Sequence, residues 1–166
     1  HVDYEFYEQV SDKINQALRN YADMFEQVSI DEAYLDVTQK VHGDFEVAKE
    51  LGQRIKDDVM RQHGLSFSVG IGPNKLVAKI ACDNKKPDGL TVVKPDEVTL
   101  FLEPLTVDLV LGVGRKTTAK MELLGIRTIG DLARFDVQRL VEVFGKILGV
   151  YLHYAANGVD DEPVQA

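Results

Sequence analysis

The sequence predicts an α+β fold followed by a smaller part made of helices alone. Two long stretches carry apolar residues at helical spacing, and short apolar runs bounded by turn residues lie around them. This interleaving of helices and hairpins is typical of an antiparallel sheet that helices cover on one face. Beyond Pro95 there is no convincing strand, and short helical stretches are separated by glycines. We therefore place a boundary near residues 94–96.

Residues 4–21 are predicted to form an amphipathic helix, because apolar side chains recur at steps of three and four residues. These side chains are Tyr7, Val10, Ile14, Leu18 and Tyr21. A strand is expected next, then a turn that holds Asp31 and Glu32, and then a second strand that ends near Val37. The helical pattern returns over residues 44–62.

Gly64 is expected to end this second helix, and residues 65–71 are predicted to form a strand. Asn74 can cap a third helix, because its side chain can accept hydrogen bonds from the first free backbone N–H groups. Residues 87–89, Pro-Asp-Gly, indicate a turn, and a short strand is expected over 90–93.

Composition indicates a folded, soluble protein, since 45% of its 166 residues are hydrophobic. No apolar run approaches the roughly 20 residues of a membrane span, and the amino terminus does not resemble a signal peptide. The single cysteine, Cys82, excludes an internal disulfide framework, which fits a reducing cytoplasm. The net charge of −8 disfavours DNA binding except through local clusters of Lys and Arg. Two such clusters are present: Lys75, Lys79, Lys85 and Lys86, and then Arg115, Lys116 and Lys120.

Asp31 and Glu32 are adjacent carboxylates that lie between two apolar runs. Two acids at a strand end repel each other unless a positive charge lies beside them. A divalent metal ion is the obvious candidate, because Mg²⁺ prefers hard oxygen ligands. Taken alone, however, such a pair is also common on solvated turns.

Four motifs occur in a fixed order along the chain: SIDEAYLD at 29–36, SVGIGPNKLVAKIA at 68–81, KKPDGL at 85–90 and LGVGRKTTAKMELLGI at 111–126. In this order and spacing the chain resembles the Y-family (DinB-like) translesion DNA polymerases, especially the archaeal type. The resemblance implies a partial palm domain over 1–94, a thumb domain with a helix-hairpin-helix element over 95–158, and the start of a linker over 159–166. It also implies that the first palm strand, the fingers and the little-finger domain lie outside this chain, so that the isolated fragment is expected to be inactive.

In that family the palm binds two Mg²⁺ ions, with Mn²⁺ as an alternative, and transfers a nucleotide from a dNTP to a primer 3′-hydroxyl. The resemblance makes Asp31 and Glu32 the catalytic metal ligands, with a third carboxylate on the first palm strand. Lys86 takes the place of the lysine that binds the incoming triphosphate. The sequence leaves open whether Lys75 and Lys79, on one helix face, contact phosphate. The implied partners are primer-template DNA, a dNTP and a sliding clamp that would contact regions outside this chain.

The glycines at 112 and 114 resemble the hairpin of a helix-hairpin-helix element, where backbone N–H groups approach a DNA phosphate. Further DNA-binding donors are expected from the helix that follows, at Arg115, Lys116, Thr117 and Lys120. Such contacts hold the DNA backbone without reading its bases.

Two other functions were compared with the polymerase. A non-catalytic helix-hairpin-helix module would bind DNA through residues 112–120, but it has no use for adjacent metal-binding acids or for the KKPDGL motif. A nucleotide cyclase with a palm fold would use the acids, but it gives no reason for the helical second part.

Overall fold

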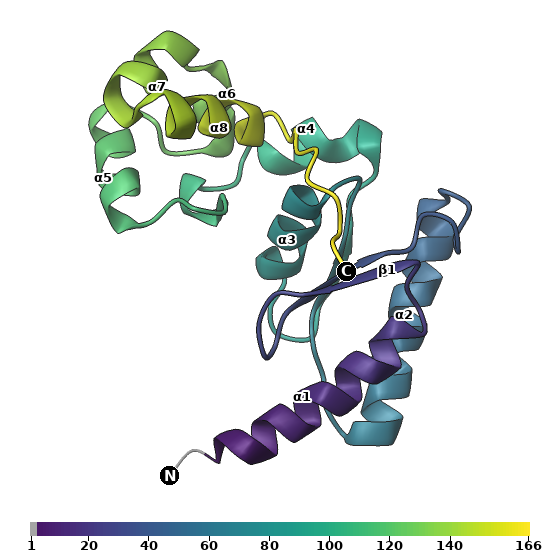
Figure 1. Cartoon of the computed structure of the whole chain (residues 1–166). Coiled ribbons are helices and arrows are strands. Elements are labelled where there is room, and N and C mark those ends of the chain that lie inside the picture. Colours follow the sequence, from purple (N-terminus) through teal and green to yellow (C-terminus); the bar gives the residue numbers. More distant parts are fainter. Residues whose placement is uncertain (1–2) are drawn as a thin grey trace.

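The computed structural model describes residues 3–166, which form a mixed α/β part and a helical part (Figure 1). The first part contains α1 (Tyr4–Arg19), β1 (Met24–Gln27), β2 (Ala33–Asp36), α2 (Phe45–His63), β3 (Val69–Ile71), α3 (Lys75–Asn84) and β4 (Leu90–Val92). The second contains the 3₁₀ turns η1 (Pro95–Glu97) and η2 (Val107–Leu109), and the helices α4 (Val98–Leu102), α5 (Arg115–Leu123), α6 (Ile129–Arg134), α7 (Val137–Phe144) and α8 (Lys146–Ala156). Each predicted helix is present, and no strand lies between residues 95 and 166.

The long helices begin and end where their local sequence predicts. The Asp44 side chain accepts hydrogen bonds from two backbone N–H groups at the start of α2, and the Asn74 side chain accepts one from Val77 at the start of α3. Helix α2 ends at Gly64, whose φ of 65° is the left-handed conformation that favours glycine. None of the helices within the described residues is long and apolar enough to cross a membrane.

The strands pair differently from a single antiparallel sheet. Strands β1 and β2 form the expected antiparallel hairpin, with Glu26 opposite Tyr34. Strands β3 and β4 form a separate parallel pair, because α3 connects them and carries the chain back to the starting end of the sheet. The strand predicted over 65–71 is confined to 69–71, since its partner β4 offers only three residues.

The buried apolar residues form two hydrophobic cores. One joins α1, β1 and α2 through residues that include Leu18, Phe25 and Val59. The other joins α3 to the helical part through residues that include Ile80, Met121 and Leu152. The packing is therefore continuous across the boundary expected near residues 94–96, and the division of the chain into two domains there stays a prediction.

The carboxy-terminal segment, residues 158–166, returns from α8 across α3 to β1 (Figure 1). The Asn74 side chain donates to the Gly158 carbonyl at 2.8 Å, and the Leu76 N–H donates to Asp160 at 3.1 Å. Near the end of the chain, the Gln165 N–H donates to Glu26 at 2.9 Å. The segment predicted to begin a linker thus lies against the α/β part.

Candidate active site and nucleic-acid interface

Asp31 and Glu32 lie in the turn that joins β1 to β2. The Ser29 hydroxyl donates to Asp31 at 2.8 Å, and the Val28 N–H donates to the Glu32 carbonyl at 2.9 Å. The buried Ser11 hydroxyl of α1 donates to the Ile30 carbonyl and so anchors the turn from outside the hairpin. The sequence analysis missed Ser11, because a single serine in a helical pattern gives no sign of a contact with a distant carbonyl.

Lys79 of α3 reaches across to this turn. Its ammonium group donates to Glu32 and also to Asp83, the latter at 3.3 Å. Its side chain is only 20% exposed, whereas the Glu32 side chain is 38% exposed. Burial by itself would lower the pKa of Lys79, but the hydrogen bond to Glu32 and the charge of Asp83 outweigh burial and raise it. Lys79 is therefore a firmly charged partner of Glu32.

Lys75 makes an equivalent pair one helical turn earlier. Its ammonium group donates to Glu26 at 2.8 Å and lies 4.9 Å from the centre of the Tyr34 ring. The hydrogen bond from Lys75, and a second from the Gln165 N–H, lower the pKa of Glu26. Whether either lysine contacts phosphate was left open by the sequence; the structure pairs both with glutamates of the hairpin.

Lys86 belongs to the same group of charges. Its ammonium group lies 3.0 Å from Asp83, which raises the pKa of Lys86 through their hydrogen bond. Ion pairs thus connect four alternating charges, Glu32, Lys79, Asp83 and Lys86, which are called the ion-pair network below. Folding brings the predicted metal ligand and the predicted triphosphate ligand into one network.

The donor set fits part of a divalent-metal site. Asp31 and Glu32 supply hard, solvent-accessible oxygens of the kind that Mg²⁺ prefers. Across residues 3–166, however, no group of three or more His, Cys, Asp or Glu side chains could hold an ion. These residues therefore suit two ligands of a metal ion and do not complete its coordination.

The predicted DNA-binding hairpin lies in the helical part, apart from the acidic turn. Gly112 has a φ of 87°, which favours glycine, and Gly114 precedes the first turn of α5 without any side-chain cap. Arg115, Lys116 and Lys120 are exposed, and within the described part of the chain they form no ion pairs. Free backbone N–H groups beside Arg115 and Lys116 at the start of α5 suit an anion such as phosphate, and Lys120 lies one turn further along the helix.

Tyr151 of α8 holds this hairpin from behind. Its hydroxyl donates to the Leu111 carbonyl at 2.6 Å, and its ring lies against Gly112. Burial raises the pKa of Tyr151, so the hydroxyl keeps its proton as a donor. The sequence analysis missed this residue, because the contact joins positions 40 residues apart and α8 shows only an ordinary apolar pattern.

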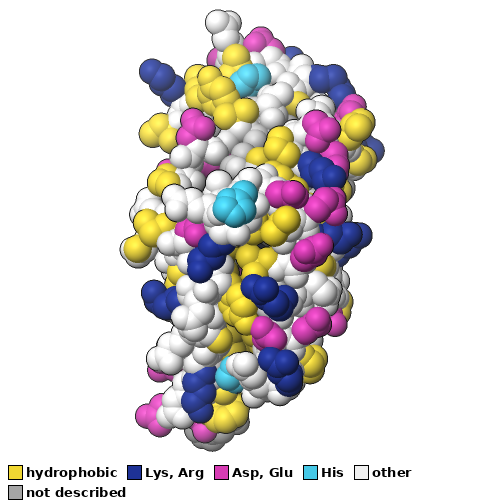
Figure 2. Space-filling view, turned by 90° about the vertical axis from the view of Figure 1, so that its right-hand side faces the viewer, with side chains coloured by type: hydrophobic (Ala, Val, Ile, Leu, Met, Phe, Trp, Pro, Cys, Tyr) yellow, Lys and Arg dark blue, Asp and Glu magenta, His cyan; other side chains and the backbone are white. Residues whose placement is uncertain are grey.

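Charges of both signs are mixed on one face of the molecule. Figure 2 shows Lys and Arg side chains interspersed with Asp and Glu over the face seen there.

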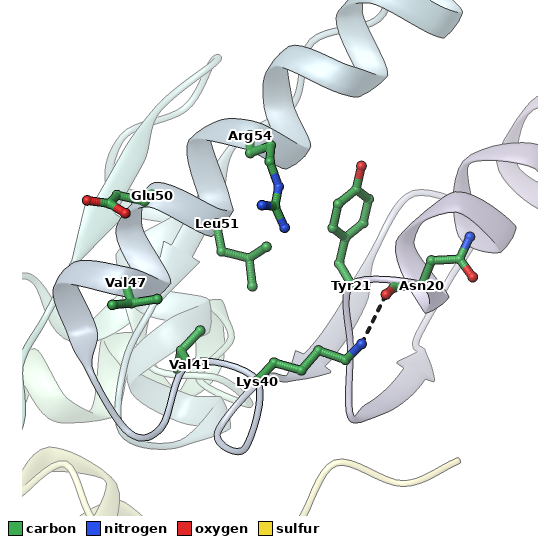
Figure 3. Close-up of a pocket in the computed structure, with 8 residues that line it drawn as sticks. All are labelled: Asn20, Tyr21, Lys40, Val41, Val47, Glu50, Leu51 and Arg54. Carbon is green, nitrogen blue, oxygen red and sulfur yellow. Dashed lines mark hydrogen bonds between the residues drawn. The ribbon is translucent and has the colours of Figure 1, made fainter.

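A surface depression between α1 and α2 is lined by residues that include Tyr21, Lys40, Leu51 and Arg54 (Figure 3). The Lys40 ammonium group donates a hydrogen bond to the Asn20 carbonyl there. None of the predicted site residues lines this depression.

A family model described as the impB/mucB/samB family matches residues 1–83, which are half of the chain. The chain belongs to this family, the Y-family of DNA polymerases. A second model, described as the thumb domain of DNA polymerase iota, matches residues 110–160 and so includes the predicted hairpin. The Y-family resemblance of the four motifs is thereby confirmed. Membership of a DNA polymerase family indicates a requirement for a divalent metal.

Curated Y-family relatives are similar along almost the whole chain. DNA polymerase IV 1 of Methanosarcina mazei is 46% identical over 166 residues, which cover 97% of this chain and 46% of the relative. DNA polymerase IV of Nitrosopumilus maritimus is 44% identical, with 99% of this chain and 45% of the relative covered. The chain therefore spans about half the length of the curated relatives that it matches.

Solved Y-family structures share the fold. DinB from Sulfolobus solfataricus is 39% identical, with a TM-score of 0.91 over 98% of this chain and 48% of that one. An insertion ternary complex of Dbh DNA polymerase gives a TM-score of 0.92 at the same identity, over 98% of this chain and 47% of that one. These matches support the α+β fold with a helical thumb that the sequence predicts.

Proposed function

We propose that this chain supplies the palm and thumb of a template-directed DNA polymerase for translesion synthesis, which transfers nucleotides from dNTPs to a primer 3′-hydroxyl. The observation that carries the proposal is the ion-pair network, which connects Glu32 of the acidic turn to Lys86 of the KKPDGL motif. A polymerase needs this proximity, because the metal ligands and the triphosphate ligand act on the same reacting group.

In this proposal Asp31 and Glu32 hold divalent ions, with Mg²⁺ as the natural ion and Mn²⁺ as a substitute. When bound, the ions lower the pKa of the primer hydroxyl and neutralise charge on the triphosphate. Lys86 is half-exposed beside a tight turn, where its ammonium group acts as a point charge for phosphate oxygens. A third carboxylate would come from a segment outside these residues.

The hairpin at 112–120 is proposed to bind the backbone of primer-template DNA. Gly112 and Gly114 let the backbone N–H groups approach a phosphate, and Arg115, Lys116, Thr117 and Lys120 surround it with donors. Residues 1–94 would act as the palm, 95–158 as the thumb and 159–166 as the start of a linker. We further assign the protein to the cytoplasm, and any sliding clamp to regions outside these residues.

Primer extension tests the proposed function directly. Residues 1–166 replace the matching region of the Methanosarcina mazei relative, and the grafted protein is assayed with primer-template DNA, dNTPs and Mg²⁺. We expect the graft to extend the primer and the separate 166-residue polypeptide to give no product above background, because two carboxylates do not complete a metal site. A folded graft that binds DNA but never extends a primer would favour the non-catalytic DNA-binding module. Extension by the separate polypeptide would contradict its expected inactivity.

Tyr151→Phe tests the hairpin assignment. Losing the hydrogen bond to the Leu111 carbonyl should loosen the hairpin and weaken binding of duplex DNA by about 3- to 10-fold, in line with about 1 kcal/mol for one hydrogen bond. Fluorescence anisotropy at several salt concentrations measures the affinity and its salt dependence. The salt slope should stay at the wild-type value, because no cation is lost.

Two further variants serve as controls for Tyr151→Phe. Tyr154→Phe is the matched control, since Tyr154 lies on the same helix and, among the described residues, its hydroxyl makes no hydrogen bond. Lys116→Ala with Lys120→Ala should reduce both the affinity and the salt slope. If this double variant binds DNA normally, the hairpin is not the interface; if only Tyr151→Phe binds normally, Tyr151 does not position it.

A further inference from the structure

We propose that the Lys79 ammonium group occupies the place of a cation beside Glu32, so that Lys79 competes with the divalent metal for this carboxylate. The inference rests on the proposed metal role of Glu32 and deepens it. It makes Lys79 a positioning residue that sets how readily the acidic turn takes up metal.

The contact geometry is the first argument. The Glu32 side chain is accessible to solvent in the turn. One of its carboxylate oxygens already accepts a hydrogen bond from the Lys79 ammonium group. Two cations cannot share that oxygen without strong repulsion. Metal binding through that oxygen, or through both carboxylate oxygens together, therefore requires Lys79 to move.

The second argument is that Lys79 has somewhere to go. Asp83 lies one helical turn along α3, and its carboxylate already contacts the Lys79 ammonium at 3.3 Å. A small rotation of the side chain would transfer Lys79 from Glu32 to Asp83. This transfer leaves no partly buried charge without a partner, which would otherwise make the displacement costly.

A consequence reaches Lys86 through the same carboxylate. Asp83 contacts the Lys86 ammonium at 3.0 Å as well as Lys79. When Lys79 turns fully to Asp83, the attraction that holds Lys86 weakens, because the carboxylate charge is then shared with a closer cation. Metal uptake at Glu32 would in this way release Lys86 toward a triphosphate.

Mn²⁺ binding to the 166-residue chain tests the competition, with free Mn²⁺ measured by electron paramagnetic resonance. Lys79→Met should raise the affinity about tenfold, since one partly buried ion pair no longer has to be broken. Lys79→Arg keeps the charge and should stay within about threefold of the wild type. Circular dichroism checks that each variant is folded.

Lys75→Met is the matched control. Lys75 lies on the same face of α3, is similarly buried and pairs with Glu26 instead of Glu32. Its replacement removes the same charge, so a general effect of net charge would raise Mn²⁺ affinity in both variants. Competition at Glu32 predicts a large increase for Lys79→Met alone.

Asp83→Asn tests the transfer of Lys79. This substitution should lower Mn²⁺ affinity when Lys79 is present. It should have little effect when it is combined with Lys79→Met, because only a lysine at position 79 needs Asp83 as a second partner. Equal effects in both backgrounds would show simple loss of negative charge.

The outcomes separate the inference from the function on which it rests. Mn²⁺ binding that is unaffected by Asp31→Asn with Glu32→Gln overturns the metal role of the turn. A second outcome is that Mn²⁺ binding depends on these acids but is no tighter in Lys79→Met than in the wild type. This outcome overturns the proposed competition and leaves the metal role of the turn intact.

Discussion

Primer extension by the grafted polymerase should fall about 100-fold or more on replacing Glu32 with glutamine, the loss that a misplaced reacting group can cause. The amide keeps the size of the side chain but removes the negative charge that a divalent ion requires. It also weakens the pair with Lys79, leaving a partly buried ammonium group where a metal should bind. Steady-state extension at saturating Mg²⁺ and dNTP measures the effect.

Glu26→Gln is the control for Glu32→Gln. Glu26 lies on the same hairpin and pairs with the equivalent lysine of α3, but it is not placed among the reacting groups. Its replacement should change extension by less than about threefold, as is usual for the loss of one ion pair of modest strength. Similar losses in both variants would mean that the hairpin responds to any disturbed ion pair, and Glu32 would lose its assignment as a metal ligand.

Gly70→Ala should lower the free energy of unfolding by about 3 kcal/mol or more, at the upper end of overpacking effects. A Cβ atom at Gly70 would lie 2.0 Å from the Ala78 carbonyl oxygen and 2.4 Å from the Cys82 nitrogen. Both are backbone atoms of α3, so no side-chain rotation relieves the clash. Helix α3 would have to move off β3, and it carries Lys79 as well as part of the second core.

Gly114→Ala is the matched control for stability. A Cβ atom there meets nothing within 4 Å, and its φ of −95° suits any residue. The free energy of unfolding should therefore stay within about 0.5 kcal/mol of the wild type. Urea denaturation followed by circular dichroism compares the three proteins. A loss below about 1 kcal/mol for Gly70→Ala would show that α3 is free to shift, and the close packing of α3 on β3 would not be needed for stability.

Local structure was largely predictable because its causes are local. The helical spacing of apolar residues, the caps at Asn74 and Gly64, and the acidic turn between two strands each depend on residues a few positions apart. The order of four motifs was also readable without a structure, and it indicated the family that the comparisons confirm. The ligand roles of Asp31, Glu32 and Lys86 stay predictions.

The tertiary structure alone decided how distant segments meet. The parallel pairing of β3 with β4 follows from the placement of α3, and short strands give no sign of their direction in their own composition. The pairing of Lys79 with Glu32, and the support of Leu111 by Tyr151, join residues 47 and 40 positions apart. Charge and apolar spacing show only that a lysine is on a helix face or a tyrosine in a core. Which partner each one finds depends on how α3 and α8 pack, and that is set by burial of the whole core.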